Sequence, residues 1–470
     1  MKLTRAFAFS AFFLSSTLLA QNWPQFRGPN AGGVPTSASG LPTIATTLPT
    51  EFNIDSGKNI AWRTPIPGLA HASPIIWSNT VYLLTVVSAE KAELKVGLYG
   101  DIAAANDHGP QTWRLLAVDK NTGATHWNKI AHIAVPRVKR HTKATHANST
   151  PATDGTHIAA IIGSEGLFCF DTRGELLWKK DLGPMDSGFF MSKSAQWGFA
   201  SSPVIHDSKV IVQCDVQTNS FIAAFNVKNG DELWRTERTD VPTWSTPTIV
   251  KIGINDSAKT NILVNGWHQT AAYDFHTGKQ IWWHDGGGDI PTPTPIIGNF
   301  GHEKLAYFTS AHGRFRPMMA IRLTNSDGTP NPALKDNITA ATFGETNAAI
   351  AWIHPRQGAY MQTPILVGET LYSCTDNGVL TAFNARTGQI LYSERLVPGG
   401  QGFTTSPVSD GKNIFFASET GNIFIVPAEE RFSKTGPFPL NETVMATPAI
   451  SDNALYIRTR DHLVCIRESK

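Results

Sequence analysis

Cysteine is scarce in this chain, with only four in 470 residues. No two are adjacent, and none stands in a Cys-x-x-Cys or Cys-x-x-Cys-His pattern, so a covalently attached haem is excluded. Each lies inside an apolar stretch, as Cys169 does in Leu167–Phe170, which is typical of small buried thiols. A disulfide between Cys169 and Cys214 stays open, because pairing cannot be deduced from sequence. The four are Cys169, Cys214, Cys374 and Cys465.

The chain also lacks an excess of charge of either sign. It has 40 Lys and Arg against 38 Asp and Glu, and two of the basic residues, Lys2 and Arg5, lie at the extreme N-terminus. Without them the balance is even, which argues against general binding of nucleic acid. The basic run 137–143 is interpreted as a solvated loop, with a local binding patch as the alternative.

Long hydrophobic runs are missing except at the start of the chain. After Lys2 and Arg5, residues 6–20 are mostly apolar and are followed by polar Gln21 and Asn22. This pattern predicts a secretory signal peptide over residues 1–20, cleaved after Ala20, rather than a spanning helix. We therefore expect a periplasmic or secreted protein without a transmembrane segment after cleavage. No cysteine follows the cleavage site, so a lipid-anchored form is not expected.

What the chain does contain is a repeated Ser-Pro or Thr-Pro dipeptide before a short apolar stretch. The intervals between successive prolines are 77, 52, 44, 48, 69, 43 and 41 residues. A recurring unit of this kind is the signature of an architecture whose units cannot bury their apolar faces alone. The prolines are Pro74, Pro151, Pro203, Pro247, Pro295, Pro364, Pro407 and Pro448.

A second landmark follows in most units: Asp or Asn, a Thr-Gly or similar turn, and then an aromatic residue. It occurs over 119–127, 171–178, 226–234 and 274–282, and more weakly over 384–392. Each unit fits four short strands. In the first unit they are 73–77, 81–85, 114–118 and 125–130, bounded by turn-forming residues. Proline cannot donate a ladder hydrogen bond and suits an inner edge strand. The sequence therefore predicts an all-β, eight-bladed β-propeller of four-stranded antiparallel blades.

The two ends of the chain indicate how the ring closes. Residues 454–458 and 462–466 supply two strands of the last unit, but the chain stops before a fourth. Residues 59–66, with Trp62, resemble a fourth strand and are predicted to complete the eighth blade. The propeller then occupies 59–470, and 21–58 is an N-terminal extension whose segment 22–30 is expected to matter less for stability than 59–66.

Three stretches are longer than the blades require, namely 88–111, 131–147 and 311–350. Such insertions decorate a face of the ring and often carry recognition. Trp352 is the candidate for the displaced aromatic residue of the fifth unit. The seventh unit has neither Thr-Gly nor Trp after Val426, so the outer strands of blades five and seven are the least defined.

The motif Ala117-Val-Asp119…Trp127 resembles the tryptophan-docking motif of pyrroloquinoline quinone (PQQ)-like β-propellers. That group includes PQQ-dependent alcohol dehydrogenases and the BamB-like subunit of the outer-membrane β-barrel assembly machinery. The resemblance covers nearly the whole mature chain, and 23–30 looks like the start of a group of secreted PQQ-repeat proteins. It implies the fold and a docking role between blades for Trp62, Trp127, Trp178, Trp234, Trp282 and Trp352.

In the dehydrogenases of that group, the quinone lies in the central channel against a vicinal disulfide, with calcium and a carboxylate base nearby. This chain has no adjacent cysteines, and no set of Glu, Asn and Asp matches the calcium ligands. We therefore expect no catalytic residues, no metal and no cofactor. A quinoprotein oxidoreductase with PQQ and calcium is the alternative.

Residues just before each inner strand are expected at one mouth of the channel, where several aromatic or histidine side chains gather. They could plug the channel or bind a ligand or peptide. His71 and His146 alone are weak indications of a metal, and 312–316 is interpreted as a surface loop. The mouth residues are His71, His146 with Asn148, Trp197 with Phe199, Trp244, Asp289, Tyr360 with Met361, Phe403 and Met445.

The expected function is that of a non-catalytic binding or scaffold module whose partner is another protein or a surface ligand. Nucleic acid is not an expected partner. A third alternative is a glycan-binding propeller that uses Trp197, Trp244 and Tyr360.

Overall fold

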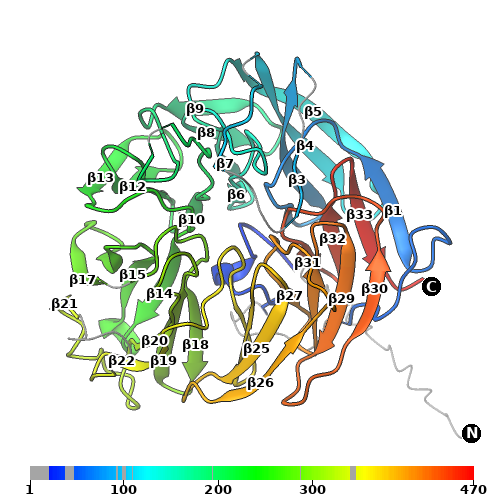
Figure 1. Cartoon of the computed structure of the whole chain (residues 1–470). Coiled ribbons are helices and arrows are strands. Elements are labelled where there is room, and N and C mark those ends of the chain that lie inside the picture. The colour runs from blue at the N-terminus through cyan, green and yellow to red at the C-terminus, as the bar shows by residue number, and fades with distance from the viewer. Residues whose placement is uncertain are drawn as a thin grey trace, which may run out of the picture.

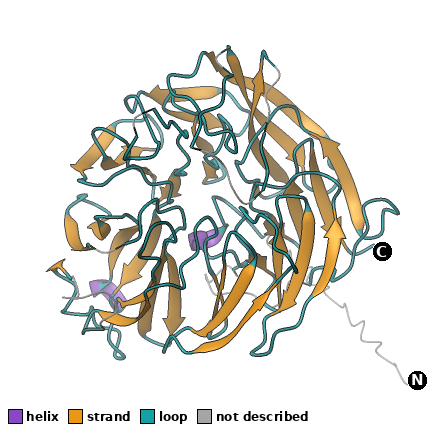
Figure 2. Ribbon diagram, in the orientation of Figure 1, coloured by secondary structure: helices purple, strands orange, loops and turns teal. Residues whose placement is uncertain are grey.

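The computed structural model describes residues 21–36, 47–90, 94–97, 102–107, 109–192, 194–285, 287–338 and 346–469. The predicted signal peptide lies outside these residues. Nearly all regular structure is β-strand (Figure 2), with two short 3-10 helices, η1 (Pro29–Ala31) and η2 (Asn255–Ser257). No helix in the described ranges is long and apolar enough to cross a membrane.

The strands form eight antiparallel sheets, the blades, arranged around a ring as the sequence predicted (Figure 1). Blade one is β2 (Ile75–Trp77), β3 (Thr80–Ser88), β4 (Gln111–Asp119) and β5 (Thr125–Ala134). Blade two is β6 (Ala152–Thr153), β7 (His157–Ile161), β8 (Leu167–Asp171) and β9 (Leu176–Lys180). Blade three is β10 (Val204–His206), β11 (Lys209–Cys214), β12 (Phe221–Asn226) and β13 (Glu232–Glu237). Blade four is β14 (Thr248–Ile252), β15 (Lys259–Val264), β16 (Thr270–Asp274) and β17 (Gln280–His284).

The remaining four blades follow in the same order from the inner strand outward. Blade five is β18 (Ile296–Phe300), β19 (Glu303–Thr309), β20 (Met318–Arg322) and β22 (Ile350–His354). Blade six is β23 (Ile365–Val367), β24 (Thr370–Cys374), β25 (Val379–Asn384) and β26 (Ile390–Arg395). Blade seven is β27 (Val408–Ser409), β28 (Asn413–Ala417), β29 (Asn422–Pro427) and β30 (Thr435–Pro439). Blade eight is β31 (Ala449–Ser451), β32 (Ala454–Arg458), β33 (His462–Arg467) and β1 (Ile60–Pro65).

The ring closes through the N-terminal strand. β1 pairs antiparallel with β33, with Trp62 opposite Cys465 and Pro65 opposite His462, and Figure 1 shows the blue strand beside the red one. Both chain ends therefore share one sheet, and β33 has no exposed edge.

The repeated Ser-Pro and Thr-Pro dipeptides form a chain of hydrogen bonds around the centre of the ring. In each pair, the backbone N–H of the residue before proline donates to the hydroxyl of the equivalent residue in the next blade. The bond from Thr150 to Ser202 measures 2.9 Å and that from Ser202 to Thr246 measures 3.0 Å. Proline leaves the hydroxyl-bearing residue extended and removes a donor from the inner edge. The chain runs Ser73, Thr150, Ser202, Thr246, Thr294, Thr363, Ser406 and Thr447.

The Thr-Gly turn explains the second landmark. The tryptophan on the outer strand of one blade packs on the turn glycine of the next, whose left-handed φ and close contact both require glycine. At Gly230, φ is +72° and an added Cβ would lie 2.6 Å from the ring of Trp178. The indole N–H of Trp178 also donates to the backbone carbonyl of Val227 at 2.8 Å. The same contact joins Trp62 to Gly123, Trp127 to Gly174, Trp234 to Gly278 and Trp352 to Gly388.

Three blade junctions lack this contact. Trp282 packs on Phe308 instead, with ring centroids 6.4 Å apart. Tyr392 of blade six contacts Phe432, with ring centroids 5.6 Å apart. At the next junction, Phe438 of β30 meets Phe52 from the N-terminal region at 5.0 Å, so an aromatic residue from another part of the chain replaces the missing tryptophan.

The long stretch 311–350 is divided between two places. Residues 310–317 join β19 to β20, whereas the part after Arg322 leaves blade five and adds β21 (Asp336–Asn337) in parallel to β17 of blade four. Trp352 then returns on β22 and docks on blade six through Ala385, as predicted for the displaced aromatic residue.

Residues 21–36, assigned from sequence to an extension before the propeller, instead lie within the ring, where Figure 1 shows them in dark blue near the centre. Trp23 bridges to Ile76 of β2 and is fully buried. Arg27 is also fully buried, and its guanidinium donates to five backbone carbonyls. These carbonyls belong to Ala31, Gly32, Thr363, Pro364 and Pro407. The segment thus fastens the inner strands of distant blades.

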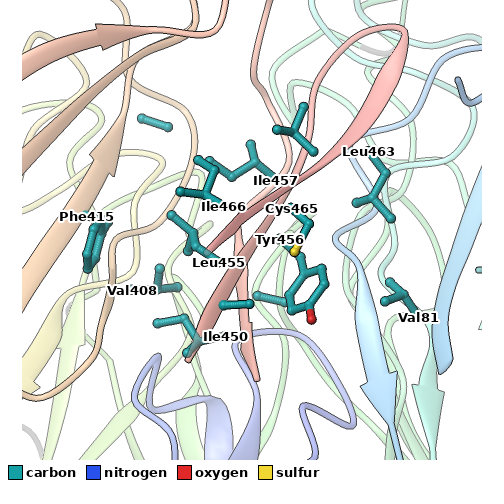
Figure 3. Close-up of a cluster of buried hydrophobic side chains, with 14 of the residues drawn as sticks. Val81, Val408, Phe415, Ile450, Leu455, Tyr456, Ile457, Leu463, Cys465 and Ile466 are labelled. Atoms are coloured by element: carbon teal, nitrogen blue, oxygen red, sulfur yellow. The ribbon is translucent and has the colours of Figure 1, made fainter. Parts of the chain in front are cut away.

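The hydrophobic core is divided into layers between neighbouring blades rather than gathered in one centre. The layer around blade eight joins Val81, Val408, Phe415 and Tyr456 from blades one, seven and eight (Figure 3). All four cysteines are free and buried, and Cys169 and Cys214 lie in one such layer without a disulfide. Burial raises the pKa of Cys169 to about 12, so this thiol is inert.

Candidate functional site

Two sets of loops meet on one face of the ring. Because neighbouring strands of a blade run in opposite directions, the connection before each inner strand and the loop between second and third strands emerge on the same side. We call this side the loop face. It carries the insertions 89–110 and 135–151, whereas the insertion after Arg322 emerges on the opposite side.

An aromatic cluster covers part of the loop face. Its members come from three blade connections and two inter-strand loops, and each ring contacts at least one other. All are partly exposed, and neighbouring Met191 is 75% exposed. The cluster comprises Phe189, Phe190, Trp197, Trp244, Trp267, His312 and Tyr360.

Trp197 lies at the centre of the cluster. Its ring stacks on Phe189, with centroids 5.7 Å apart and an interplanar angle of 17°. On another side it meets Trp244 at 5.7 Å and His141 at 5.7 Å. The indole N–H of Trp244 donates to the backbone carbonyl of Gly198 at 2.8 Å, which fixes one tryptophan to the loop of the other. The sequence prediction that Trp197 and Trp244 converge agrees with this geometry.

His312 and Asp289 extend the cluster toward Tyr360. Nδ1 of His312 lies 3.0 Å from Oδ2 of Asp289, and its ring is 5.8 Å from that of Tyr360. Burial, helped by the charges of Asp376 and Asp289, raises the pKa of Tyr360 to about 12, so the phenol stays protonated. The loop 312–316, interpreted from sequence as a surface loop, therefore contributes a ring to the cluster.

A buried charge network positions Trp267. Arg238 binds Asp215 at 2.6 Å and Asp240 at 3.3 Å, and all three side chains are inaccessible to solvent. Asp240 accepts backbone N–H groups from Trp267, His268 and Gln269, at 2.9 to 3.2 Å. A carboxylate saturated with donors in this way holds the short loop rigidly. Trp267 is thereby presented against Phe190, with ring centroids 4.6 Å apart.

The mouth of the channel is spanned by an ion pair beside this cluster. Nζ of Lys143, before blade two, lies 2.8 Å from Glu419 of blade seven. The backbone N–H of Gly97 donates to the same carboxylate at 2.6 Å, and Lys143 also donates to the carbonyl of Gly97. Glu419 is almost fully buried, so these contacts tie the first insertion across the ring.

His71 and His146, also predicted at the mouth, are not brought together as a side-chain pair. His71 Nε2 is buried without a hydrogen-bond partner. Burial, together with the charges of Arg140 and Lys143, lowers the pKa of His71 to about 3, so it is neutral at physiological pH. His146 instead approaches Asp107, with Nε2 3.7 Å from Oδ2.

Asp107 and His146 line a separate cavity of about 290 Å³ between blades one and eight. Arg140 Nε lies 2.7 Å from Asp107 Oδ2. Burial alone would raise the pKa of Asp107, but the interaction with nearby His146 and the hydrogen bond and charge of Arg140 outweigh it and lower the value to about 2. This is an internal ion pair set apart from the aromatic cluster.

The other predicted mouth residues are dispersed. Phe403 is 1% exposed and packs against Phe424 at 6.0 Å, so it belongs to the core between blades six and seven. Phe199 and Met445 are likewise buried, whereas Asn148 and Met361 are half-buried. The structure thus groups Trp197, Trp244, Asp289 and Tyr360 into one surface, leaves His71 and His146 outside it, and places Phe403 inside.

Sequence reasoning missed Phe189, Phe190, Trp267 and His312. None lies directly before an inner strand, where the sequence predicted the residues of the channel mouth. A signal was present in Gly188-Phe-Phe-Met191, where three large apolar side chains stand together in a blade connection, and in Trp267, on an inter-strand loop that requires no apolar residue.

The described part of the chain contains no group of three or more His, Cys, Asp or Glu side chains that could hold a metal ion. The side chains of Trp23 and Arg27, in the N-terminal segment, are fully buried.

Comparison with known proteins identifies a family from the sequence. A family model described as outer membrane protein assembly factor BamB matches residues 111–431. The BamB protein of Shewanella oneidensis is 21% identical over 315 residues, covering 66% of this chain and 71% of that protein.

Solved structures show the same fold at low identity. BamB from Moraxella catarrhalis superposes with a TM-score of 0.50 at 14% identity, covering 82% of this chain and 100% of that one. A europium-containing methanol dehydrogenase gives 0.55 at 12% identity, covering 94% and 90%. A quinohemoprotein alcohol dehydrogenase from Pseudomonas putida gives 0.57 at 12%, covering 96% and 81%. These likenesses establish the propeller alone.

Proposed function

Because the chain belongs to the family of the outer membrane protein assembly factor BamB, we propose that it is a non-catalytic binding module that recognises a protein partner through the aromatic cluster. The observation that carries the proposal is the contact of seven aromatic side chains, from five separate loops, on one face of the propeller. Large aromatic side chains at a surface supply contact area at a low cost in conformational entropy and are enriched at protein interfaces.

The positions of these side chains support recognition over a purely structural plug. Trp197, Trp244 and Tyr360 are all partly exposed, unlike the docking residue Trp282, which is 1% exposed. The indole N–H groups of Trp197 and Trp244 nevertheless donate to the backbone carbonyls of Ile102 and Gly198, which fixes both rings. The Asp240 network fixes the neighbouring Trp267. A preformed apolar surface with a polar margin at Asp289 and His312 is what a protein partner requires.

We place the protein in the periplasm on two grounds. The predicted signal peptide at residues 1–20 directs export. The family relatives are named as outer membrane assembly factors, which fits an envelope role. Mass spectrometry of the protein recovered from cell fractions tests this location.

Mutation of the aromatic cluster tests the binding role. The triple variant Trp197→Ala, Trp244→Ala, Tyr360→Ala should abolish capture of the partner from a membrane extract, because it removes the central contact surface. Trp178→Ala is the matched control, since it removes a docking tryptophan from the opposite end of the blades. It should lower stability without affecting capture by the folded fraction.

A thermal melt of the triple variant separates the two roles of the cluster. A recognition surface should lose little stability, whereas a plug would lose several kcal/mol, because truncating a buried aromatic side chain leaves a cavity. A large loss of stability, or capture that survives the triple substitution, would contradict the proposal.

The enzymatic alternative has its own test. We expect no one-to-one complex with PQQ in the presence of Ca²⁺ and no dye-linked oxidation of alcohols, because no group of three or more metal-binding His, Cys, Asp or Glu side chains occurs among the residues that the structure describes. Titration of the purified protein with PQQ and Ca²⁺, followed by quinone absorbance after gel filtration, measures this directly. A stoichiometric complex would contradict the non-catalytic proposal and support the quinoprotein oxidoreductase alternative.

A further inference from the structure

The residue that follows the predicted cleavage point, Gln21, is in contact with the ring. Gln21 is held by blade eight on both sides of its backbone. Its N–H donates to Oδ1 of Asp452 at 2.9 Å, and its carbonyl accepts from the hydroxyl of Ser451 at 2.5 Å. Two residues later, Trp23 is fully buried against β2.

The carboxylate that receives Gln21 is already part of a charge network. Oδ2 of Asp452 accepts from Nζ of Lys120 at 2.5 Å. Lys120 is 4% exposed and Asp452 is 43% exposed, so one oxygen faces the interior and the other faces Gln21 at the surface. Asp452 therefore has an oxygen available for a second cation.

We infer that Asp452 is a docking site for the mature N-terminus, created when a leader peptidase cleaves the Ala20–Gln21 bond. Water adds to the carbonyl carbon of Ala20, which leaves as a carboxylate, and the amide nitrogen of Gln21 becomes an α-ammonium group. The neutral amide donor at 2.9 Å from Asp452 thereby becomes a cation. The bond already has an ionised acceptor, and a positive charge on the donor adds the attraction of an ion pair, so processing strengthens the anchor of the segment.

Docking of the N-terminus also affects the segment at the centre of the ring. Residues 21–33 connect blade eight at Asp452 to the carbonyl network of Arg27 in blades six and seven. Fixing the first residue reduces fraying of this buried segment, which chain termini otherwise show. Export processing and closure of the ring are thus linked through one ion pair. This inference shares only the signal peptide with the proposed function and does not depend on the aromatic cluster.

The N-terminal residue offers a chemical reporter. A free N-terminal glutamine cyclises when its α-amine attacks its own side-chain carboxamide, forming a new C–N bond and releasing ammonia. The reaction needs an unprotonated, mobile amine. An α-ammonium paired with Asp452 is retained in its protonated form and held away from the side chain, so cyclisation and acylation should both be slow.

The experiment uses the protein purified from the periplasm. Intact mass should show a chain that begins at Gln21. The rate of α-amine acylation in Asp452→Asn should exceed that of the wild type by about two- to fivefold, the range expected for a partly exposed ion pair. Loss of ammonia from Gln21 should accelerate in parallel. Asp327→Asn, which removes a carboxylate on a distant exposed turn, is the matched control and should leave both rates unchanged.

A second measurement needs no variant, in case Asp452→Asn weakens folding by leaving Lys120 unpaired. In the wild type, the α-amine should be acylated more slowly in native than in unfolded protein, relative to exposed Lys228. A mature chain that begins at another residue would overturn the inference. So would equal α-amine reactivity in native and unfolded protein.

Discussion

At the residue scale, a single hydroxyl explains why Ser or Thr precedes proline in every blade. The hydroxyl accepts the backbone N–H of the preceding blade, and seven such bonds connect the eight blades. The series starts at Ser73, whose own hydroxyl is buried without a partner. Equivalent positions in the repeat thus differ in whether their hydroxyl is used.

This difference gives a prediction with an internal control. Ser202→Ala should lower the free energy of unfolding by about 1–3 kcal/mol, because the N–H of Thr150 is left buried and unpaired. Ser73→Ala removes the same atom from an equally buried position and should be close to neutral. Denaturant unfolding of both variants measures the difference, and equal losses would show that the hydroxyl ring does not stabilise the fold.

The lowered pKa of His71 predicts how the free energy of unfolding depends on pH. Its pKa is about 3 in the folded protein against an ordinary value of 6.5, so the unfolded chain binds more protons between these values. Stability is therefore fully present above pH 6.5 and falls as pH decreases toward 3. His71→Gln should flatten this decline by up to about 1.4 kcal/mol per pH unit. Urea unfolding midpoints measured from pH 7 to pH 4 would show this change in pH dependence. An unaltered slope in His71→Gln would contradict the lowered pKa of His71.

At the scale of the element, the outer strand of one blade and the Thr-Gly turn of the next act as a unit. Five of the eight junctions use tryptophan on glycine. The others occur where the next blade lacks a glycine at this turn position, and there Phe308, Phe432 or Phe52 supplies the contact. The fold therefore requires an aromatic contact between blades but allows it to come from different segments.

Two glycines of blade six test this unit. Gly388 and Gly368 both have left-handed φ, at +76° and +60°, but only Gly388 faces a docking ring, 2.7 Å from Trp352. Gly368→Ala should cost about 1–2 kcal/mol for its backbone conformation alone. Gly388→Ala should cost about 1–3 kcal/mol more, because the methyl group overpacks the junction. Thermal unfolding of the two variants compares their losses of stability directly. Equal losses would mean that the junction accommodates the added methyl group without strain.

At the scale of the whole molecule, the N-terminal region supports the ring from two sides. β1 covers the edge of β33, and residues 21–36 fasten the inner strands. The expectation that 22–30 matters less than 59–66 is revised, because Trp23 and Arg27 are fully buried. Trp62 is only half-buried, so Trp62→Ala should cost less than the about 3–5 kcal/mol of a fully buried ring.

Arg27 offers the clearest test of this support. Arg27→Met keeps most of the side-chain volume but leaves carbonyls of Thr363, Pro364 and Pro407 without their donor. We expect a loss of about 3 kcal/mol or more, since each unpaired buried acceptor costs about 1–3 kcal/mol. Arg173→Met, at a side chain 83% exposed, should have no measurable effect. Calorimetry of the two variants measures these losses of stability. An Arg27→Met protein as stable as the wild type would show that the contacts of Arg27 do not stabilise the ring.

The sequence by itself determined the propeller, its eight blades and the docking tryptophans, because these depend on local chemistry that recurs along the chain. Proline marks inner strands, and glycine marks the turns that receive Trp178 or Trp352. It also indicated that Trp197 and Trp244 converge, since equivalent positions of a repeat lie on one face. Only the tertiary structure decided that Phe403 points inward, that His312 joins the cluster and that residues 21–36 fill the ring. Those outcomes depend on contacts between distant and non-repeating segments, for which no periodic pattern exists to be read.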